Sequence, residues 1–344
     1  MGIYVPTELN LDSSYHDNIT NQYIWLPGKP NIMDLYLCTS IAILGLILNI
    51  ISFYIFSDKK FVQLMYKYLK MESLFIIINL FFQSFRPIYY LRSDWISKSF
   101  IANIYEFYIL EFFVSTLEMS AIIMRLLSTF DFCISINRMN KRINFLSLIS
   151  YKLVTIIVFC ISVLSFIYLL FTRKIVPQKV FEIDKNNRVI NERTIYLLLD
   201  SDFVESSFKK IYEQCIYLTR DGFYLIILIV MNILILILVN QSIKKKRYLT
   251  ERSRKVSNTR NRSTLMILIT NLNFIFGRAP ILVVFIVKNN QKWNETLVLF
   301  CSLAVLFVYV SFMLNFFVFY FFNNRFKKLL NEKLKIIKNK LLLK

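Results

Sequence analysis

An uninterrupted apolar segment near the C-terminus constrains the fold more than any other feature of the chain. It runs from residue 297 to residue 322 and contains no charged side chain. About 20 apolar residues in a helix cross the hydrocarbon core of a bilayer, so this segment predicts a membrane-spanning helix. In the basic stretch that follows, the apolar residues share one helical face: Phe326, Leu330, Leu334, Ile337 and Leu341. An amphipathic helix of this kind is suited to the surface of an anionic membrane.

The rest of the chain repeats the apolar pattern. Of its 344 residues, 56% are hydrophobic, which is typical of proteins that cross a membrane several times. Further apolar segments of spanning length lie at residues 33–56, 66–91, 100–135, 146–171, 223–240 and 264–287. We therefore expect an all-α membrane protein, a seven-transmembrane helix bundle with a short amphipathic C-terminal surface helix.

The distribution of charge predicts the orientation of this bundle. Basic clusters recur at every second connection, at residues 59–70, 138–142, 244–262 and 325–344. Loops rich in Lys and Arg stay in the cytoplasm, so we expect a multi-pass plasma-membrane protein with its N-terminus outside. Residues 1–32 are then an extracellular segment, residues 33–322 the transmembrane domain, and residues 323–344 a cytoplasmic helix and tail. Two N-glycosylation acceptors, Asn18 and Asn294, fall on the predicted outer side.

Composition excludes several classes of function. The net charge of +20 indicates anionic lipid of the inner leaflet as a partner, rather than nucleic acid. The chain has one histidine, His16, and its five cysteines form no CxxC motif. A metal site, a bound cofactor and a His-based catalytic triad are therefore not expected, and the chain does not look like an enzyme.

Four short motifs carry a family resemblance. Asn49 closes a Gly-x-x-x-Asn motif in the first helix, and Asp131 lies at the inner end of the third. Phe274 and Pro280 lie six residues apart in the sixth helix, where Pro280 predicts a kink, and Asn315 is followed four residues later by Phe319. At these spacings the chain resembles the rhodopsin-like G-protein-coupled receptors, as a divergent member of invertebrate type. The resemblance covers residues 33–338 and implies activation through movement of the sixth helix.

The chain departs from that family at several of these motifs. Phe132 and Cys133 stand where the family has the Arg and Tyr that follow Asp131, and Phe316 replaces the Pro after Asn315. The family's sodium-binding Asp is missing from the second helix. Asn79 is the best candidate for that position, because Glu72 is expected too close to the cytoplasmic end. Cys215 has no evident disulfide partner, since the usual Cys at the outer end of the third helix is absent.

Charged residues in the predicted bundle point to a ligand pocket. Charges in a bilayer are costly, so Glu111 and Glu118 should face the bundle or water. By family spacing, Val114 occupies the amine-binding position and Arg278 replaces a pocket Trp. Our hypothesis is that Glu118 and Arg278 form a salt bridge that holds the sixth helix inward until a ligand breaks it. The alternative is that the two charges lie in a wet pocket and are each met by water or by ligand.

The connections between helices divide into an outer and an inner set. In the outer connection at residues 172–221, residues 179–196 read as a β-hairpin, although a disordered polar loop is the alternative. The inner connections are basic, and the resemblance implies that they face a heterotrimeric G protein. The residues expected to do so are Arg138, Lys244, Lys245, Lys246 and Arg325.

These features predict a receptor that binds an extracellular ligand and signals through a heterotrimeric G protein. A neuropeptide or a chemosensory molecule is the expected ligand, because Val114 disfavours an amine and no Lys lies in residues 297–322 for a retinal. Two alternatives stay open. One is a seven-helix receptor-like protein that does not couple to G proteins, and the other is a ligand-gated channel or a transporter.

Overall fold

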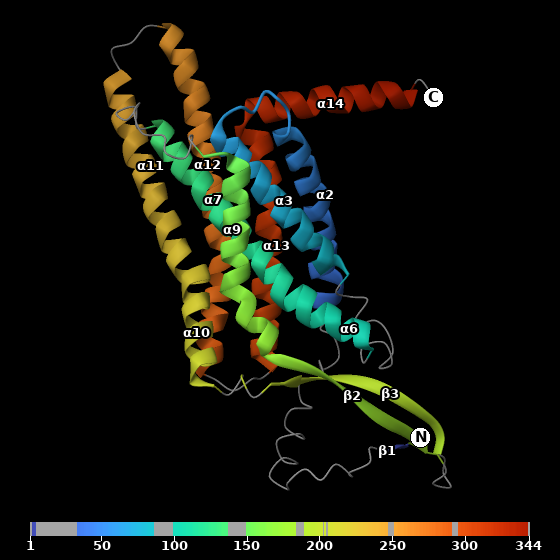
Figure 1. Cartoon of the computed structure of the whole chain (residues 1–344). Coiled ribbons are helices and arrows are strands. Elements are labelled where there is room, and N and C mark those ends of the chain that lie inside the picture. Colours follow the sequence, from blue (N-terminus) through green and yellow to red (C-terminus); the bar gives the residue numbers. More distant parts are fainter. Residues whose placement is uncertain are drawn as a thin grey trace.

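The computed structural model describes residues 2–4, 33–85, 99–136, 149–183, 189–201, 203, 206–246, 251–290 and 295–342. Long helices pack side by side into a bundle, with a small sheet at one end and a single helix lying across the other (Figure 1). Strand β1 near the N-terminus and the C-terminal helix α14 lie at opposite ends of the bundle. Asn18, Asn294 and Arg138, all singled out from the sequence, lie outside the described residues.

The helices follow the apolar segments closely. Helix α2 continues a π-helical turn, Met33–Cys38, and α7 continues α6 through a longer π-helical stretch, Tyr105–Phe113. A third π-helical stretch, Leu218–Phe223, joins α10 to α11, and a 3₁₀ stretch, Ile167–Phe171, ends α9. The α-helices are α2 (Thr39–Phe56), α3 (Leu64–Ser84), α6 (Phe100–Ile104), α7 (Val114–Ile136), α9 (Tyr151–Phe166), α10 (Ser207–Tyr217), α11 (Tyr224–Lys246), α12 (Glu251–Asn290), α13 (Glu295–Phe322) and α14 (Asn324–Leu342).

The outer surface of the bundle suits a bilayer. Within the part of the chain that the structure describes, six stretches of helix are long and apolar enough to cross a membrane: Tyr36–Phe56, Phe100–Ile136, Tyr151–Phe171, Ser207–Gln241, Arg262–Val287 and Leu299–Phe322. Large apolar side chains on these helices, such as Ile161, Ile226 and Ile233, are exposed. A soluble monomer rarely exposes so much contiguous apolar surface, so the helical bundle is compatible with a membrane-embedded protein. Helix α3, the expected second span, is not among these six.

The predicted β-hairpin is confirmed. Strand β2 (Arg173–Ile183) pairs antiparallel with β3 (Val189–Asp200), in register from Arg173 opposite Asp200. Strand β1 (Gly2–Tyr4) adds to the far end of β2, so the sheet has three strands. The Nδ2 atom of Asn103 on α6 donates to the Tyr196 carbonyl oxygen at 2.8 Å, which ties β3 to the bundle.

Two segments predicted as loops are partly helical. Helix α10 begins at Ser207, because the Ser206 Oγ atom caps it and Lys209 pairs with Glu213 at 2.5 Å one turn later. The prediction of an unbroken outer loop to residue 221 was therefore wrong. Helices α11 and α12 likewise extend into the basic segment 241–263. Lys, Arg and Glu are good helix formers and this segment has no Gly or Pro, so it continues both helices.

Helices α12 and α13 pack unusually closely at one point. A Cβ atom at Gly277 on α12 would lie 2.6 Å from the Cβ and Oγ atoms of Ser311 on α13. Only glycine fits at this distance. Asn273, one turn earlier, donates from Nδ2 to the Ser311 carbonyl oxygen at 2.7 Å. These contacts fix the position of α12 along α13 in the turn that directly precedes Arg278.

Candidate functional site

Four charged side chains meet inside the bundle, and we call them the charged cluster: Glu118, Arg220, Asp221 and Arg278. They come from α7, from the π-helical stretch before α11, and from α12. The Arg278 Nη1 atom lies 3.1 Å from Glu118 Oε2 and 3.5 Å from Asp221 Oδ1. The Arg220 Nη2 atom lies 2.6 Å from Asp221 Oδ2, and its Nη1 atom 4.0 Å from Glu118 Oε2. The cluster therefore joins three separate segments of the bundle.

The charged cluster is buried and electrically balanced. Arg220, Asp221 and Arg278 are almost wholly inaccessible, and Glu118 is the most exposed member, with 15% of its side chain accessible. A buried charge is tolerated when it is paired, and here two guanidinium groups face two carboxylates. Aromatic rings complete the surroundings of Arg220, whose guanidinium carbon lies 4.8 Å from the Tyr217 ring centroid and 5.9 Å from that of Phe166.

The structure contains the predicted contact between Glu118 and Arg278, but it adds two partners that the sequence analysis missed. Arg220 and Asp221 were assigned to the outer connection at residues 172–221, and no partner was predicted for either of them. Their proximity to Arg278 follows from the extension of the fifth helical segment back to Ser207. One sequence feature could have indicated that Arg220 and Asp221 lie in the bundle: they are adjacent and of opposite charge, and they directly precede a long apolar run.

A second buried ion pair joins α3 to α7 and was not predicted from the sequence. The Arg125 Nε atom lies 3.0 Å from Glu72 Oε1 and 2.9 Å from Oε2, and Arg125 Nη2 also donates to Oε1. The sequence analysis set Glu72 aside as too close to the cytoplasmic end for the sodium-binding position and predicted no partner for it. Both side chains of the pair are almost fully buried, which makes Glu72 the partner of the charge at Arg125.

The ring of Phe274 links the two sets of charges. The guanidinium carbons of Arg125 and Arg278 each lie 5.8 Å from its centroid. Phe274 is buried and packs with Ile122, Leu225 and Leu228. A cation close to an aromatic ring is attracted by its quadrupole, so Phe274 joins Arg125 of α7 to α12, the helix that also carries Arg278.

The other two predicted pocket residues lie toward the sheet. Glu111 Oε1 is 2.9 Å from Arg173 Nη1 at the start of β2, and both side chains are about one-third exposed. Val114 is buried at the junction of the π-helical stretch and α7. The structure therefore brings together Glu118 and Arg278, while Glu111 belongs to a separate contact between the π-helical stretch Tyr105–Phe113 and the hairpin.

The asparagines of the family motifs connect helices through hydrogen bonds. Asn49 on α2 donates from Nδ2 to the Phe312 carbonyl oxygen of α13 at 3.1 Å. Asn315 accepts at Oδ1 a hydrogen bond from Asn273 Nδ2 at 3.0 Å, which joins α13 to α12. Asn79 is buried on α3, but neither polar atom of its side chain has a hydrogen-bond partner among the described residues. At the position where the resemblance implies a sodium-binding Asp, Asn79 supplies a side-chain amide in place of a carboxylate.

Near the C-terminal end of α7, Asp131 and Phe132 have distinct surroundings. Asp131 Oδ2 accepts a hydrogen bond from the Met65 backbone N–H at 2.9 Å, so the carboxylate caps the N-terminus of α3. Phe132 is buried in an apolar cluster with Ile235 and Met266, from α11 and α12. The position at which the family has an arginine therefore packs as part of the core.

Helix α14 is held by its first turn to the end of the bundle opposite the sheet (Figure 1). Asn323 Oδ1 accepts from the backbone N–H groups of Arg325 and Phe326, both at 3.1 Å, and so caps the helix. The Phe326 ring is fully buried, with centroids 5.4 Å from Phe56 and 5.9 Å from Phe319. Farther along α14, Leu334 and Ile337 are exposed. This matches the expected amphipathic surface helix.

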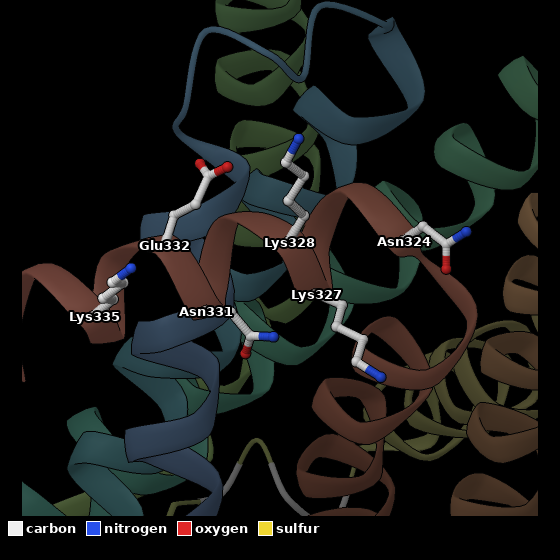
Figure 2. A pocket seen from close by; sticks show the side chains of 6 residues that line it. All are labelled: Asn324, Lys327, Lys328, Asn331, Glu332 and Lys335. Atoms are coloured by element: carbon white, nitrogen blue, oxygen red, sulfur yellow. The ribbon is translucent and has the colours of Figure 1, made fainter.

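A shallow groove runs along the exposed side of α14 (Figure 2). Lys328 and Glu332 point toward the connection between α2 and α3, where Lys60 Nζ lies 3.2 Å from Glu332 Oε2. The groove is lined by Asn324, Lys327, Lys328, Asn331, Glu332 and Lys335. It is open and basic, whereas the charged cluster is enclosed, so the interior is the better candidate for a ligand site. Of the predicted G-protein-facing residues, Arg325 is exposed here, and Lys244, Lys245 and Lys246 end α11.

No family model and no curated protein matches the chain. All five cysteines are free, including Cys215. The class of protein that the fold defines is therefore a helical bundle compatible with a membrane, built around a buried charged cluster.

Proposed function

We propose that this chain is a seven-helix receptor of the rhodopsin-like type, which binds an extracellular ligand and signals to a heterotrimeric G protein. The observation that carries the proposal is the contact of Arg278 on α12 with Glu118 on α7 and Asp221 before α11. A ligand that competes for these charges changes how α12 packs against its neighbours. Two alternative packings of one bundle are what a transmembrane switch requires.

The proposal counts α3 as the seventh spanning helix. It has 21 residues, and at about 1.5 Å per residue such a helix matches the thickness of a bilayer. Its hydropathy is lowered by Lys67, Lys70 and Glu72. The Glu72 carboxylate is neutralised by Arg125, and the two lysines are near the end where long cationic side chains reach water. Helix α3 also packs against both α2 and α7 in the middle of the bundle.

In this proposal the sheet faces the outside and α14 lies on the cytoplasmic surface. The lysines that end α11 and those of α14 share the end opposite the hairpin (Figure 1), in accord with the positive-inside rule. The hairpin extends from the outer end of α9, where it can cover or contact a peptide ligand. The exposed apolar residues of α14 then face the acyl chains, and its lysines face anionic lipid.

One observation favours a second function, a receptor-like protein that does not couple to G proteins. Phe132 replaces a cationic side chain and is buried against α11 and α12, so it offers a G protein no charge. In this case ligand binding would be read out by another cytoplasmic partner at the same inner surface.

Basal G-protein activation in cells tests the two functions side by side. Wild type and Phe132→Arg are expressed to matched surface levels, with Phe130→Arg as the control because Phe130 is exposed on the same helix. Activation by wild type supports G-protein signalling directly. Activation by Phe132→Arg alone supports the uncoupled receptor-like function. If Phe130→Arg activates as well as Phe132→Arg, the effect comes from added charge and the proposed site of coupling is wrong.

A further inference from the structure

The three arginines buried in the bundle use their guanidinium groups differently. Arg125 donates from Nε and Nη2 to the Glu72 carboxylate, and Arg220 donates from the same two atoms to Asp221 Oδ2, at 2.9 and 2.6 Å. Arg278 uses only Nη1. Its Nε and Nη2 atoms are buried and have no hydrogen-bond partner among the described residues. One of the three guanidinium edges is therefore unpaired.

An unpaired edge of this kind has a specific chemical complement. The Nε–H and Nη2–H groups of arginine are parallel and coplanar, and they match the two oxygens of a carboxylate. The protein itself uses this pairing at Arg125, where Nε and Nη2 face both oxygens of Glu72. Buried charged donors without acceptors are costly, so an acceptor that completes the Arg278 edge gains the whole of that interaction.

We propose that Arg278 is the docking point for a carboxylate group of the activating ligand. The inference rests on the proposed receptor function and adds the chemical class of the ligand. The carboxylate binds at Nε and Nη2 of Arg278, while Nη1 keeps its neighbours Glu118 and Asp221 at first.

Charge balance explains how this docking would act on the bundle. The cluster holds two cationic and two anionic side chains, so a third carboxylate creates an excess of negative charge. Glu118 is the most exposed member, and its only partners in the cluster are Arg278 at 3.1 Å and Arg220 at 4.0 Å. Asp221 is fully buried and held by two bonds from Arg220. Glu118 is therefore the side chain that the added carboxylate displaces from Arg278. Loss of this contact weakens the packing of α7 against α12.

Thermal unfolding of the purified full-length protein tests the carboxylate site without a G protein. Formate is the probe, because it is the smallest carboxylate, and formamide is its neutral counterpart at the same concentrations. We expect a saturable rise of the unfolding midpoint, about 2 °C or more, with formate but not with formamide. Arg278→Lys keeps the charge that faces Glu118 and Asp221 but removes the paired N–H edge, so it should abolish the rise.

Two further variants make the test specific. Arg262→Lys is the matched control, because Arg262 is exposed and bonds Asn324 near α14. It should keep the full response to formate. Glu118→Gln removes the competing carboxylate, so it should lower the half-saturating formate concentration by roughly threefold or more. The proposal is overturned if wild type shows no saturable response, or if Arg278→Lys responds like wild type.

The same assay separates two sources of the carboxylate. Tetraglycine carries a C-terminal carboxylate on an extended peptide, and tetraglycine amide lacks it. Stabilisation by formate and tetraglycine, but not by the amide, supports a peptide C-terminus. Stabilisation by formate alone supports a small organic acid. Since the readout is unfolding of the purified protein, a missing response refutes the carboxylate site, whereas failure to activate a G protein refutes only the signalling function.

Discussion

Arg125 and Arg278 lie equally close to one aromatic ring, with each guanidinium carbon 5.8 Å from the centroid of Phe274. Arg125 is bound to Glu72 on α3, and Arg278 to Glu118 on α7. A single side chain of α12 thus adjoins both the Glu72–Arg125 ion pair and the charged cluster. Movement of α12 relative to α7 would therefore disturb both the contact of Phe274 with Arg125 and that of Arg278 with Glu118.

The shared ring predicts the effect of Phe274→Leu. Leucine keeps most of the apolar volume but loses the interaction with both cations, which is worth about 1–2 kcal/mol at a desolvated site. We expect a lower midpoint of thermal unfolding, because α12 packs less tightly against α7. The control is Phe276→Leu, since Phe276 is on the same helix but 63% exposed. Equal effects of the two changes in thermal unfolding would show that the cations contribute nothing through Phe274.

The buried pair between α3 and α7 predicts a severe effect for Glu72→Gln. The change leaves the Arg125 guanidinium buried without a counter-charge, at a cost of about 3–5 kcal/mol. Surface expression and the thermal midpoint should fall together. Adding Arg125→Gln should recover part of the loss, because two neutral side chains can bond each other.

Glu332→Gln is the matched control for that experiment. Glu332 also pairs with a cation, Lys60, but both side chains are about half exposed. An exposed pair contributes little, so expression should stay at the wild-type level.

If Arg125→Gln aggravates the Glu72→Gln defect, the two side chains are not a pair in the membrane.

Close packing of α12 on α13 predicts that Gly277→Ala destabilises the bundle by about 1–3 kcal/mol. The added methyl group would lie 2.6 Å from Ser311, so one helix must move. Gly222→Ala is the control, because the nearest atom to its added carbon, Leu282 Cδ1, is 4.0 Å away. Ser311→Gly should restore stability to Gly277→Ala. No rescue in a thermal-unfolding assay would contradict the close approach.

The sequence predicted most helices because long apolar runs dominate their formation. The alternation at residues 179–196 also predicted the hairpin correctly. Helix α10 was missed because it is amphipathic and too polar to resemble a span. The apolar criterion used for the membrane helices does not detect such a segment, whereas its capping serine and its Lys209–Glu213 pair do favour a helix.

The candidate site was predicted in part. The cost of unpaired charges in a membrane led to the expectation that Glu118 and Arg278 would meet, and their side chains do. The same argument should have paired Arg125, but the partner lay on another helix at an unknown rotation and depth. The pairing of Arg125 with Glu72 was therefore not predicted, and Arg220 and Asp221 were left in a loop. Local sequence gives the face of one helix, whereas partners across helices depend on how the bundle packs.

In the proposed receptor Arg278 holds α12 in one of two packings, and a distance measured between α7 and α12 at the end of the bundle nearest α14 shows whether it does. Spin labels are placed at Phe130→Cys and Leu265→Cys, both exposed sites, after replacement of the five native cysteines. The pair is measured by pulsed electron spin resonance in the otherwise wild-type background and with Arg278→Gln. Arg173→Gln, which breaks the separate contact with Glu111, is the control.

Arg278→Gln removes the α12 side of the cluster, while Glu118 and Asp221 keep Arg220 as a partner. We predict that a second, longer distance appears in Arg278→Gln and is absent from Arg173→Gln. The same single distance in all three proteins would contradict the account, because α12 would then keep its packing without the charge that is proposed to hold it.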